Sequence, residues 1–193
     1  APRIAGALYH QTLRADSDRP LCKGHVRGHF HFDILRGVPD RVTLSDGRAS
    51  EAEQLRAALE PGRLYLIDRG FQQYQLLFDM IAAGSDFVVR LRASARLREL
   101  DPRPLTAADL EAGVLSDTIV RVGWRDDQTP LDAPLRCVVV AHPTRPGESL
   151  RLLTHRTDLE ASIIGLLYRH RWQIELFFRG LQCMAGFGHF FSE

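Results

Sequence analysis

A short apolar segment that ends in an acidic residue is the feature that most constrains how this chain folds. Residues 64–67 are all apolar and run directly into Asp68, after which a glycine-containing turn begins. Such a segment is typical of a strand buried on both faces in the middle of a sheet. A helical pattern over residues 73–83 and a second apolar segment over residues 86–92 follow. This alternation predicts an α/β fold with helices packed on a central sheet.

The preceding segment predicts a hairpin and a helix. Residues 25–44 alternate apolar and polar side chains around a cluster of turn residues, which is the pattern of two antiparallel strands. Ser50 and Glu53 have the spacing of a capping box, in which a serine and a glutamate satisfy the first backbone N–H groups of a helix. We therefore expect a helix over residues 51–59.

The composition changes between residues 93 and 149. Prolines, turn residues and short β-rich stretches dominate there, which predicts a small antiparallel insertion. The chain is accordingly divided into a first part of the core (residues 1–92), this β-rich insertion, and a closing part (residues 150–193) with the last core strand and a long helix. Thr157 and Glu160 have the spacing of a capping box for that helix.

Length and composition exclude several classes of protein. The 193 residues fit one domain of ordinary size, or a core with an insertion. No apolar run approaches the ~18 residues of a membrane span, so no membrane is expected as a partner. A net charge of +1 imposes no global field that would compel nucleic-acid binding. Cysteines 22, 137 and 183 are far apart and lack CxxC spacing, which favours a reduced cytoplasm over a disulfide framework or a zinc site.

The predicted final helix carries polar side chains on one face. At about 100° per residue, a stripe roughly 80° wide contains five of them: Tyr168, Arg171, Glu175, Arg179 and Gln182. A carboxylate flanked by cations suits a site that handles a metal ion and a phosphate together. The alternative is a solvated face with a ladder of salt bridges, since Glu175 has an arginine four residues away on either side.

Asp68 is the second candidate for such a site. Carboxylates at strand ends are exposed at the sheet edge where ligands bind in α/β folds, although an aspartate there also suits the N-cap of a following helix. Carboxylates that meet at a sheet edge are what a pair of Mg²⁺ ions requires. Two such ions can activate a nucleophile and stabilise the leaving oxygen of a phosphodiester. Asp68 and Glu175 are therefore candidate metal ligands, and Arg171 is a candidate for holding a phosphate oxygen.

The hairpin contains a second group of residues that could bind metal. His25, His29 and His31 have the same parity along one strand, and Asp33 continues their register. A zinc or manganese site is one interpretation of this pattern. Half-exposed strand histidines are more common, and no cysteine or second histidine pair completes a ligand set.

Two blocks of the sequence resemble a known family. The spacing of Tyr168, Arg171, Glu175 and Gln182 resembles the YREK signature of DDE transposases of the insertion-sequence-four type. Residues 68–71, Asp-Arg-Gly-Phe after an apolar strand, resemble the segment that carries the second catalytic aspartate of that family. With the strands between these blocks, the resemblance covers nearly the whole chain.

The resemblance implies a ribonuclease-H-like mixed sheet with flanking helices and a β-rich insertion before the last helix. It implies a transposase catalytic domain that performs Mg²⁺-dependent DNA strand cleavage and transfer at insertion-sequence ends, with Mn²⁺ as an alternative ion. Asp68 would be the second metal-binding catalytic aspartate, and Glu175 the third acid. The DNA-binding residues on the final helix would be Tyr168, Arg171, Arg179 and Gln182.

The partners implied are the terminal inverted repeats of the transposon and target DNA, with a homodimer in the DNA complex as a further expectation. The location implied is the bacterial cytoplasm, with association to the nucleoid when DNA is bound. The chain departs from the family at Gln182, where the signature has a lysine; Arg179 on the same stripe could substitute for that cation.

The more serious departure concerns the first catalytic aspartate, which the family carries on its first strand. Residues 1–13 contain no acidic side chain, and Asp16 and Asp18 belong to a polar stretch that does not suit a strand. The absence of an initiator Met suggests a piece of a longer protein. We therefore expect the first aspartate to precede Ala1 and this fragment to be inactive. The alternatives are a non-catalytic DNA-binding remnant of a transposase and a small metal-dependent phosphohydrolase.

Overall fold

The computed structural model describes residues 3–5, 8–14, 25–46, 48–122 and 134–185. The strands are β1 (Arg3–Ala5), β2 (Leu8–Arg14), β3 (His25–Asp33), β4 (Val38–Asp46), β5 (Arg63–Ile67), β6 (Asp86–Arg90), β7 (Leu97–Pro102), β8 (Val114–Val122), β9 (Leu135–Ala141) and β10 (Ser149–Thr154). The helices are α1 (Glu51–Ala57), the 3₁₀ turn η1 (Arg69–Phe71), α2 (Tyr74–Ala82), α3 (Ala107–Glu111), α4 (Ala161–His170) and α5 (Trp172–Ala185).

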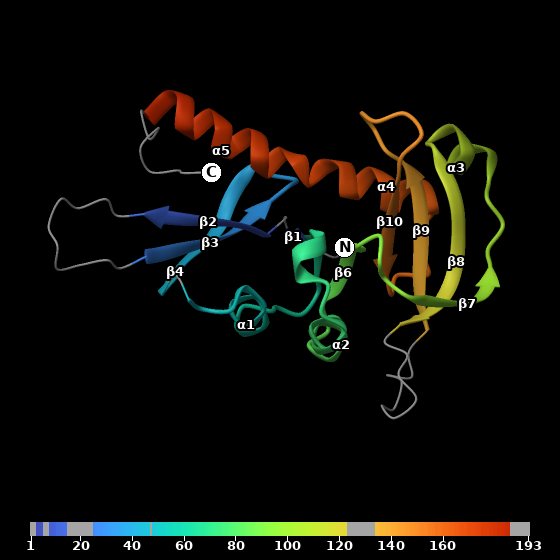
Figure 1. The fold of residues 1–193 in the computed structure, drawn as a ribbon, viewed down its shortest axis with the longest axis horizontal. Coiled ribbons are helices and arrows are strands. Elements are labelled where there is room, and N and C mark those ends of the chain that lie inside the picture. Colours follow the sequence, from blue (N-terminus) through green and yellow to red (C-terminus); the bar gives the residue numbers. More distant parts are fainter. Residues whose placement is uncertain (1–2, 6–7, 15–24, 47, 123–133, 186–193) are drawn as a thin grey trace, which may run out of the picture.

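Most of the described strands form one mixed sheet. Its order is β1-β5-β6-β10-β9-β8-β7, and a smaller antiparallel sheet has the order β2-β3-β4 (Figure 1). β1, β5 and β6 run parallel to one another, whereas β10, β9, β8 and β7 continue the sheet through antiparallel pairs. The α/β layout predicted from the sequence is therefore present.

Helices on both sides explain why β5 is apolar throughout. Tyr65 and Ile67 belong to a core that also contains the buried residues of α1 and α2. Leu64 and Leu66 belong to a second core, formed with residues of α4 and α5 on the other side of the sheet. All four side chains are buried. Because neither face of β5 meets solvent, alternation between apolar and polar side chains is lost along this strand.

The predicted hairpin and first helix are also present. β3 pairs with β4 in antiparallel register, and the side chain of Ser50 accepts a hydrogen bond from the N–H of Glu53 at the start of α1. None of the described helices has the length and apolarity that crossing a membrane requires.

The β-rich stretch over residues 93–149 extends the central sheet. β9 pairs with β10 over six residues, and β8 and β7 follow in turn. The stretch also contains α3, a short helix that the sequence pattern did not indicate. The strands of this stretch therefore share one sheet with the strand that ends at Asp68.

The single long final helix predicted from the sequence is instead two helices, α4 and α5, which meet at Arg171. The N–H of Arg171 donates to the carbonyl oxygen of Tyr168 at 3.1 Å, a bond that spans three residues instead of four. The backbone of Arg171 stays in the right-handed helical region, with φ −54° and ψ −29°. The tighter bond interrupts the regular helix while its residues still pack on the same core.

The predicted capping box at Thr157 and Glu160 is wrong. Glu160 is the N-cap of α4, but its side chain makes no capping hydrogen bond. The carboxylate of Asp109 in α3 takes that part, since its Oδ1 accepts from the N–H of Ser162 at 2.7 Å. A side chain 53 residues away thus satisfies a donor of the first turn.

Candidate functional site

Asp68 lies directly after β5, and its side chain has two partners. Its Oδ1 accepts a hydrogen bond from the N–H of Arg69 at 2.8 Å, which makes Asp68 the N-cap of η1. The same oxygen accepts from the hydroxyl of Tyr168 at 3.1 Å. Asp68 therefore caps the following turn, which is one of its two sequence interpretations, and it also contacts the final helical segment.

Tyr168 is a buried residue near the end of α4, with 3% of its surface exposed. Burial raises the pKa of its phenol well above the ordinary value, and the charge of Asp68 and the hydrogen bond between them raise it further. Tyr168 consequently keeps its proton at neutral pH and donates a hydrogen bond to the carboxylate of Asp68.

Arg171 connects this pair to the second acid. Its Nη2 lies 2.9 Å from Oε1 of Glu175, and its side chain is only 8% exposed while that of Glu175 is 34% exposed. The guanidinium carbon lies 5.7 Å from the centre of the Tyr168 ring, within the range of a cation–π contact. Burial lowers the pKa of Arg171, but the oxygens of Tyr168, Asp68 and Glu175 outweigh it and the net shift is upward. Arg171 therefore stays charged.

The structure thus brings together four of the residues predicted from sequence. We call Asp68, Tyr168, Arg171 and Glu175 the carboxylate cluster. The cluster contains two acids with a guanidinium in contact with one of them. Within the described residues, no group of three or more His, Cys, Asp or Glu side chains is arranged to hold a metal ion. The oxygen donors suit Mg²⁺, but they are too few for a pair of ions.

The two remaining predicted residues lie further along α5. Arg179 is exposed. Gln182 belongs to the same helix, and its side chain lies outside the described part of the structure. Arg179 therefore differs from the cation and the phenol of the carboxylate cluster, which are buried.

Arg90 is a member of the surroundings that sequence reasoning missed. The parallel register pairs Ile67 with Val89, so Asp68, directly after β5, and Arg90, the last residue of β6, lie at the same edge of the sheet. The charge of Arg90 acts on Tyr168. Arg90 and Tyr168 also line a cavity of about 180 Å³, mostly apolar, together with Trp172. The sequence did contain a signal for Arg90, because it is a cation at the carboxyl end of a second parallel strand, where ligands bind in α/β folds.

His29 and His31 of the hairpin are buried, which differs from the half-exposed positions considered from the sequence. Nε2 of His29 lies 2.7 Å from the hydroxyl of Ser45. Burial, with the charges of Arg41 and Arg63, lowers the pKa of His31 to about 4. Oδ1 of Asp33 accepts from the N–H of Arg36 and so closes the hairpin turn. These groups are engaged in packing and turn formation.

The strand beside β5 on the side away from β6 is β1. Its register pairs Ile4 with Leu64 and Ala5 with Tyr65 in parallel orientation. β2 follows and pairs with β3. Neither strand contains an acidic residue, and Asp16 and Asp18 lie outside the described residues.

Comparison with known proteins connects this geometry to one family. The family model described as "Transposase DDE domain" matches residues 21–190. The protein "Putative transposase y4zB" of Sinorhizobium fredii is 30% identical over 201 residues, covering 93% of this chain and 56% of that protein. "Transposase InsG for insertion sequence element IS4" of Escherichia coli is 30% identical over 181 residues, covering 91% and 37% respectively. The chain thus spans about half the length of these relatives or less.

A solved structure shares the fold. A chain of the piggyBac transposase synaptic complex with hairpin DNA matches 94% of this chain and 41% of its own length, with a TM-score of 0.56 and 12% sequence identity. At that identity the likeness concerns the fold alone, and it confirms the predicted ribonuclease-H-like α/β architecture. The family match over most of the chain, with the identity to both relatives, shows that this chain belongs to the DDE transposases of the insertion-sequence-four type.

Proposed function

We propose that this chain is part of a transposase catalytic domain whose relatives cut and join DNA at insertion-sequence ends. The observation that carries the proposal is the hydrogen bond between Tyr168 and Asp68. It joins the end of β5 to the helical segment with Glu175, and the contacts of Arg171 with the Tyr168 ring and with Glu175 continue this connection to the second acid. A buried tyrosine hydroxyl needs a hydrogen-bond partner, and here that partner is a carboxylate at the end of a strand 100 positions away in the chain.

In this proposal Asp68 and Glu175 are the acids of the metal site. Carboxylate oxygens are the ligands that Mg²⁺ prefers, and Mn²⁺ takes similar donors. A pair of ions bound by acids at a sheet edge needs more carboxylates than these two. Arg171 also engages one oxygen of Glu175. We therefore propose that the chain in its present form does not cleave DNA.

The pairing of β1 changes the interpretation of the first aspartate. From the sequence we expected that residue upstream of Ala1. Because β1 already flanks β5, we propose that the strand beside Asp68 is present in this chain and has no acid. This favours the alternative of a DNA-binding remnant over an enzyme that lacks only its beginning.

The roles proposed for the helical segment follow from burial. Tyr168 and Arg171 are buried and contact the acids, so they position the carboxylates before they meet DNA. Nε of Arg171 has no hydrogen-bond partner among the described residues, which leaves a donor for a phosphate oxygen. Arg179 is exposed and contacts the DNA backbone directly, with Gln182 three residues further along α5.

The proposed partners are the terminal repeats of the insertion sequence, target DNA and a second copy of the chain. The proposed location is the bacterial cytoplasm.

A plasmid assay with a metal titration tests this function. We expect the chain to bind a fluorescent DNA duplex with an affinity that falls as salt rises. We expect no nicking of supercoiled plasmid with Mg²⁺ or Mn²⁺. Metal-dependent nicking that disappears in Asp68→Asn and Glu175→Gln would show an active site and overturn the proposed inactivity. Absence of any DNA binding at low salt would overturn the proposed DNA partner.

A further inference from the structure

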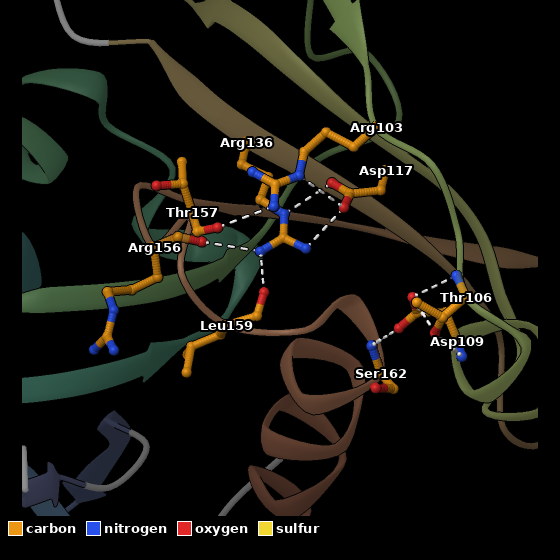
Figure 2. A network of polar contacts seen from close by, with 9 residues as sticks. All are labelled: Arg103, Thr106, Asp109, Asp117, Arg136, Arg156, Thr157, Leu159 and Ser162. Carbon is orange, nitrogen blue, oxygen red and sulfur yellow. Dashed lines mark hydrogen bonds and ion pairs between the residues drawn. The ribbon is translucent and has the colours of Figure 1, made fainter.

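Arg136 is a fully buried arginine whose contacts reach from the sheet to the loop before α4. It lies on β9 and is 1% exposed. Its Nε and Nη2 donate to the two oxygens of Asp117 on β8, at 2.8 and 2.7 Å. Its Nη1 donates to the carbonyl oxygens of Arg156 and Leu159 (Figure 2). One guanidinium thus satisfies a buried carboxylate and holds two backbone carbonyls of the loop.

A second arginine holds the same loop. Nε of Arg103 lies 3.3 Å from Oδ2 of Asp117, and its Nη2 donates to the carbonyl oxygen of Thr157 at 3.0 Å (Figure 2). Arg103 and Arg136 therefore share one carboxylate and bind three carbonyls among residues 156–159. Because Glu160 makes no side-chain cap, these contacts fix the entry into α4 in its place.

Asp109 extends this arrangement to the helix itself. It is 4% exposed, and its Oδ2 accepts from the N–H and the hydroxyl of Thr106. Its Oδ1 accepts from the N–H of Ser162 in the first turn of α4. The carboxylate satisfies a backbone N–H of the first turn, and its negative charge also interacts favourably with the helix dipole at the N-terminus. α3 therefore caps α4 from outside.

We propose that Arg103, Asp109, Asp117 and Arg136 form a clamp that positions α4, and through it Tyr168, against Asp68. Ser162 and Tyr168 lie six residues apart in one helix, a distance of about 9 Å along the axis. A regular helix transmits a displacement of its first turn to Tyr168, whose hydroxyl must stay within reach of Asp68. The clamp residues all belong to the β-rich stretch over residues 93–149. That stretch consequently has a positioning role for the carboxylate cluster. The importance of this role for DNA chemistry rests on the proposed function, whereas the positioning itself does not.

A double-mutant cycle distinguishes this role from simple stabilisation. The first variant is Asp109→Ala, which removes the cap, and the second is Tyr168→Phe, which removes the hydrogen bond to Asp68. Unfolding equilibrium constants are measured in urea for each variant and for the pair. If the clamp positions Tyr168, the effect of Tyr168→Phe becomes at least 3-fold smaller in the Asp109→Ala background, because the hydrogen bond is already weakened. Strict additivity would overturn the proposal, as expected for independent sites.

Tyr65 provides the matched control. It is a buried tyrosine on the other core, and its hydroxyl donates to the carbonyl oxygen of Ala58. Tyr65→Phe should combine additively with Asp109→Ala. Coupling of the same size at Tyr65 would mean a general loosening of the fold and would contradict the clamp.

Two further variants keep the test decisive if Asp109→Ala unfolds. Asp109→Asn retains an acceptor for Ser162 but places an NH₂ group against the N–H of Thr106, so it should restore the effect of Tyr168→Phe in part. Arg136→Met combined with Asp117→Leu removes both fully buried charges together. Only Arg103, whose side chain is 34% exposed, loses a charged partner, while the contacts of Arg136 with the loop carbonyls are lost. This double substitution should reduce the effect of Tyr168→Phe as Asp109→Ala does. A folded double variant in which Tyr168→Phe keeps its full effect would overturn the proposal.

DNA binding by the wild-type protein is measured in parallel. If the wild-type protein does not bind DNA, that result contradicts the proposed function and leaves the clamp proposal unaffected.

Discussion

The hydroxyl of Tyr168 donates a hydrogen bond to Oδ1 of Asp68, although 100 positions separate the two residues in the chain. This bond joins the end of β5 to the last turn of α4. It makes the geometry of the carboxylate cluster depend on how a helix packs on the sheet, as well as on the acids themselves.

Tyr168→Phe tests the energetic weight of that bond. The ring stays and the hydroxyl is lost, so Asp68 loses a buried donor. We expect the free energy of unfolding to fall by about 1 to 2 kcal/mol, since this hydrogen bond has a charged acceptor. Urea denaturation followed by circular dichroism measures it. Tyr74→Phe, at a half-buried tyrosine that accepts from Gln72, is the control and should change stability less. Equal effects would contradict a special role for the Tyr168 bond.

Glu175→Gln tests the pairing with Arg171. The buried guanidinium loses its charged partner while Nη2 keeps a neutral acceptor, so stability should fall by about 1 kcal/mol. Thermal unfolding of Glu175→Gln, Arg171→Met and the double variant measures the coupling. The double variant should be less destabilised than the sum of the single variants, because no buried charge is left alone. Additive losses would mean that the two side chains do not interact in solution.

Arg179→Ala tests the proposed DNA contact of α5. Arg179 is exposed, so its removal should leave unfolding nearly unchanged while DNA binding weakens. The slope of log affinity against log salt should fall by about 1, as expected for one lost phosphate contact. Fluorescence anisotropy with a labelled duplex at several salt concentrations gives both quantities. Arg98→Ala, at an exposed position on β7, is the matched control. An equal effect of both substitutions would indicate non-specific attraction to the whole surface.

The pH dependence of stability should report His31. Burial lowers the pKa of His31 in the folded chain to about 4, below its ordinary value of 6.5. Between these two pH values His31 is mostly protonated in the unfolded chain and mostly neutral in the folded chain. Stability should therefore decrease as pH falls from 6.5 toward 4, by up to about 3 kcal/mol. Urea midpoints between pH 4 and 7 check this in wild type and in His31→Gln. A wild-type slope that persists unchanged in His31→Gln would assign the effect to other groups.

Local patterns were sufficient to predict much of the first half of the fold. The alternation along β3 and β4, the apolar strand before Asp68 and the cap at Ser50 each depend on neighbours within a few residues. The resemblance to the transposase signature paired Asp68 with Glu175 and assigned Tyr168 to DNA, so it did not predict the hydrogen bond from Tyr168 to Asp68.

The remaining features depend on tertiary contacts that periodicity does not contain. Arg171 interrupts the helix while keeping helical dihedral angles, so the apolar pattern continues across it. Asp109 caps α4 from another element, which no local capping pattern can predict. His31 and Tyr168 are buried by residues distant in the chain. Tyr65 of β5 packs against His31, and Tyr168 belongs to the core that contains Leu66 of β5.

The two oxygens of Asp68 are used unequally. Both hydrogen bonds that Asp68 accepts within the described residues, from Arg69 and from Tyr168, end on Oδ1. One oxygen therefore maintains the architecture, and Oδ2 is left for chemistry. An asparagine at this position can keep its amide oxygen on the two donors and present an NH₂ group where Oδ2 was. That single exchange replaces an acceptor by a donor without disturbing the frame, so at this position the demands of folding and of ligand binding fall on different atoms of one side chain.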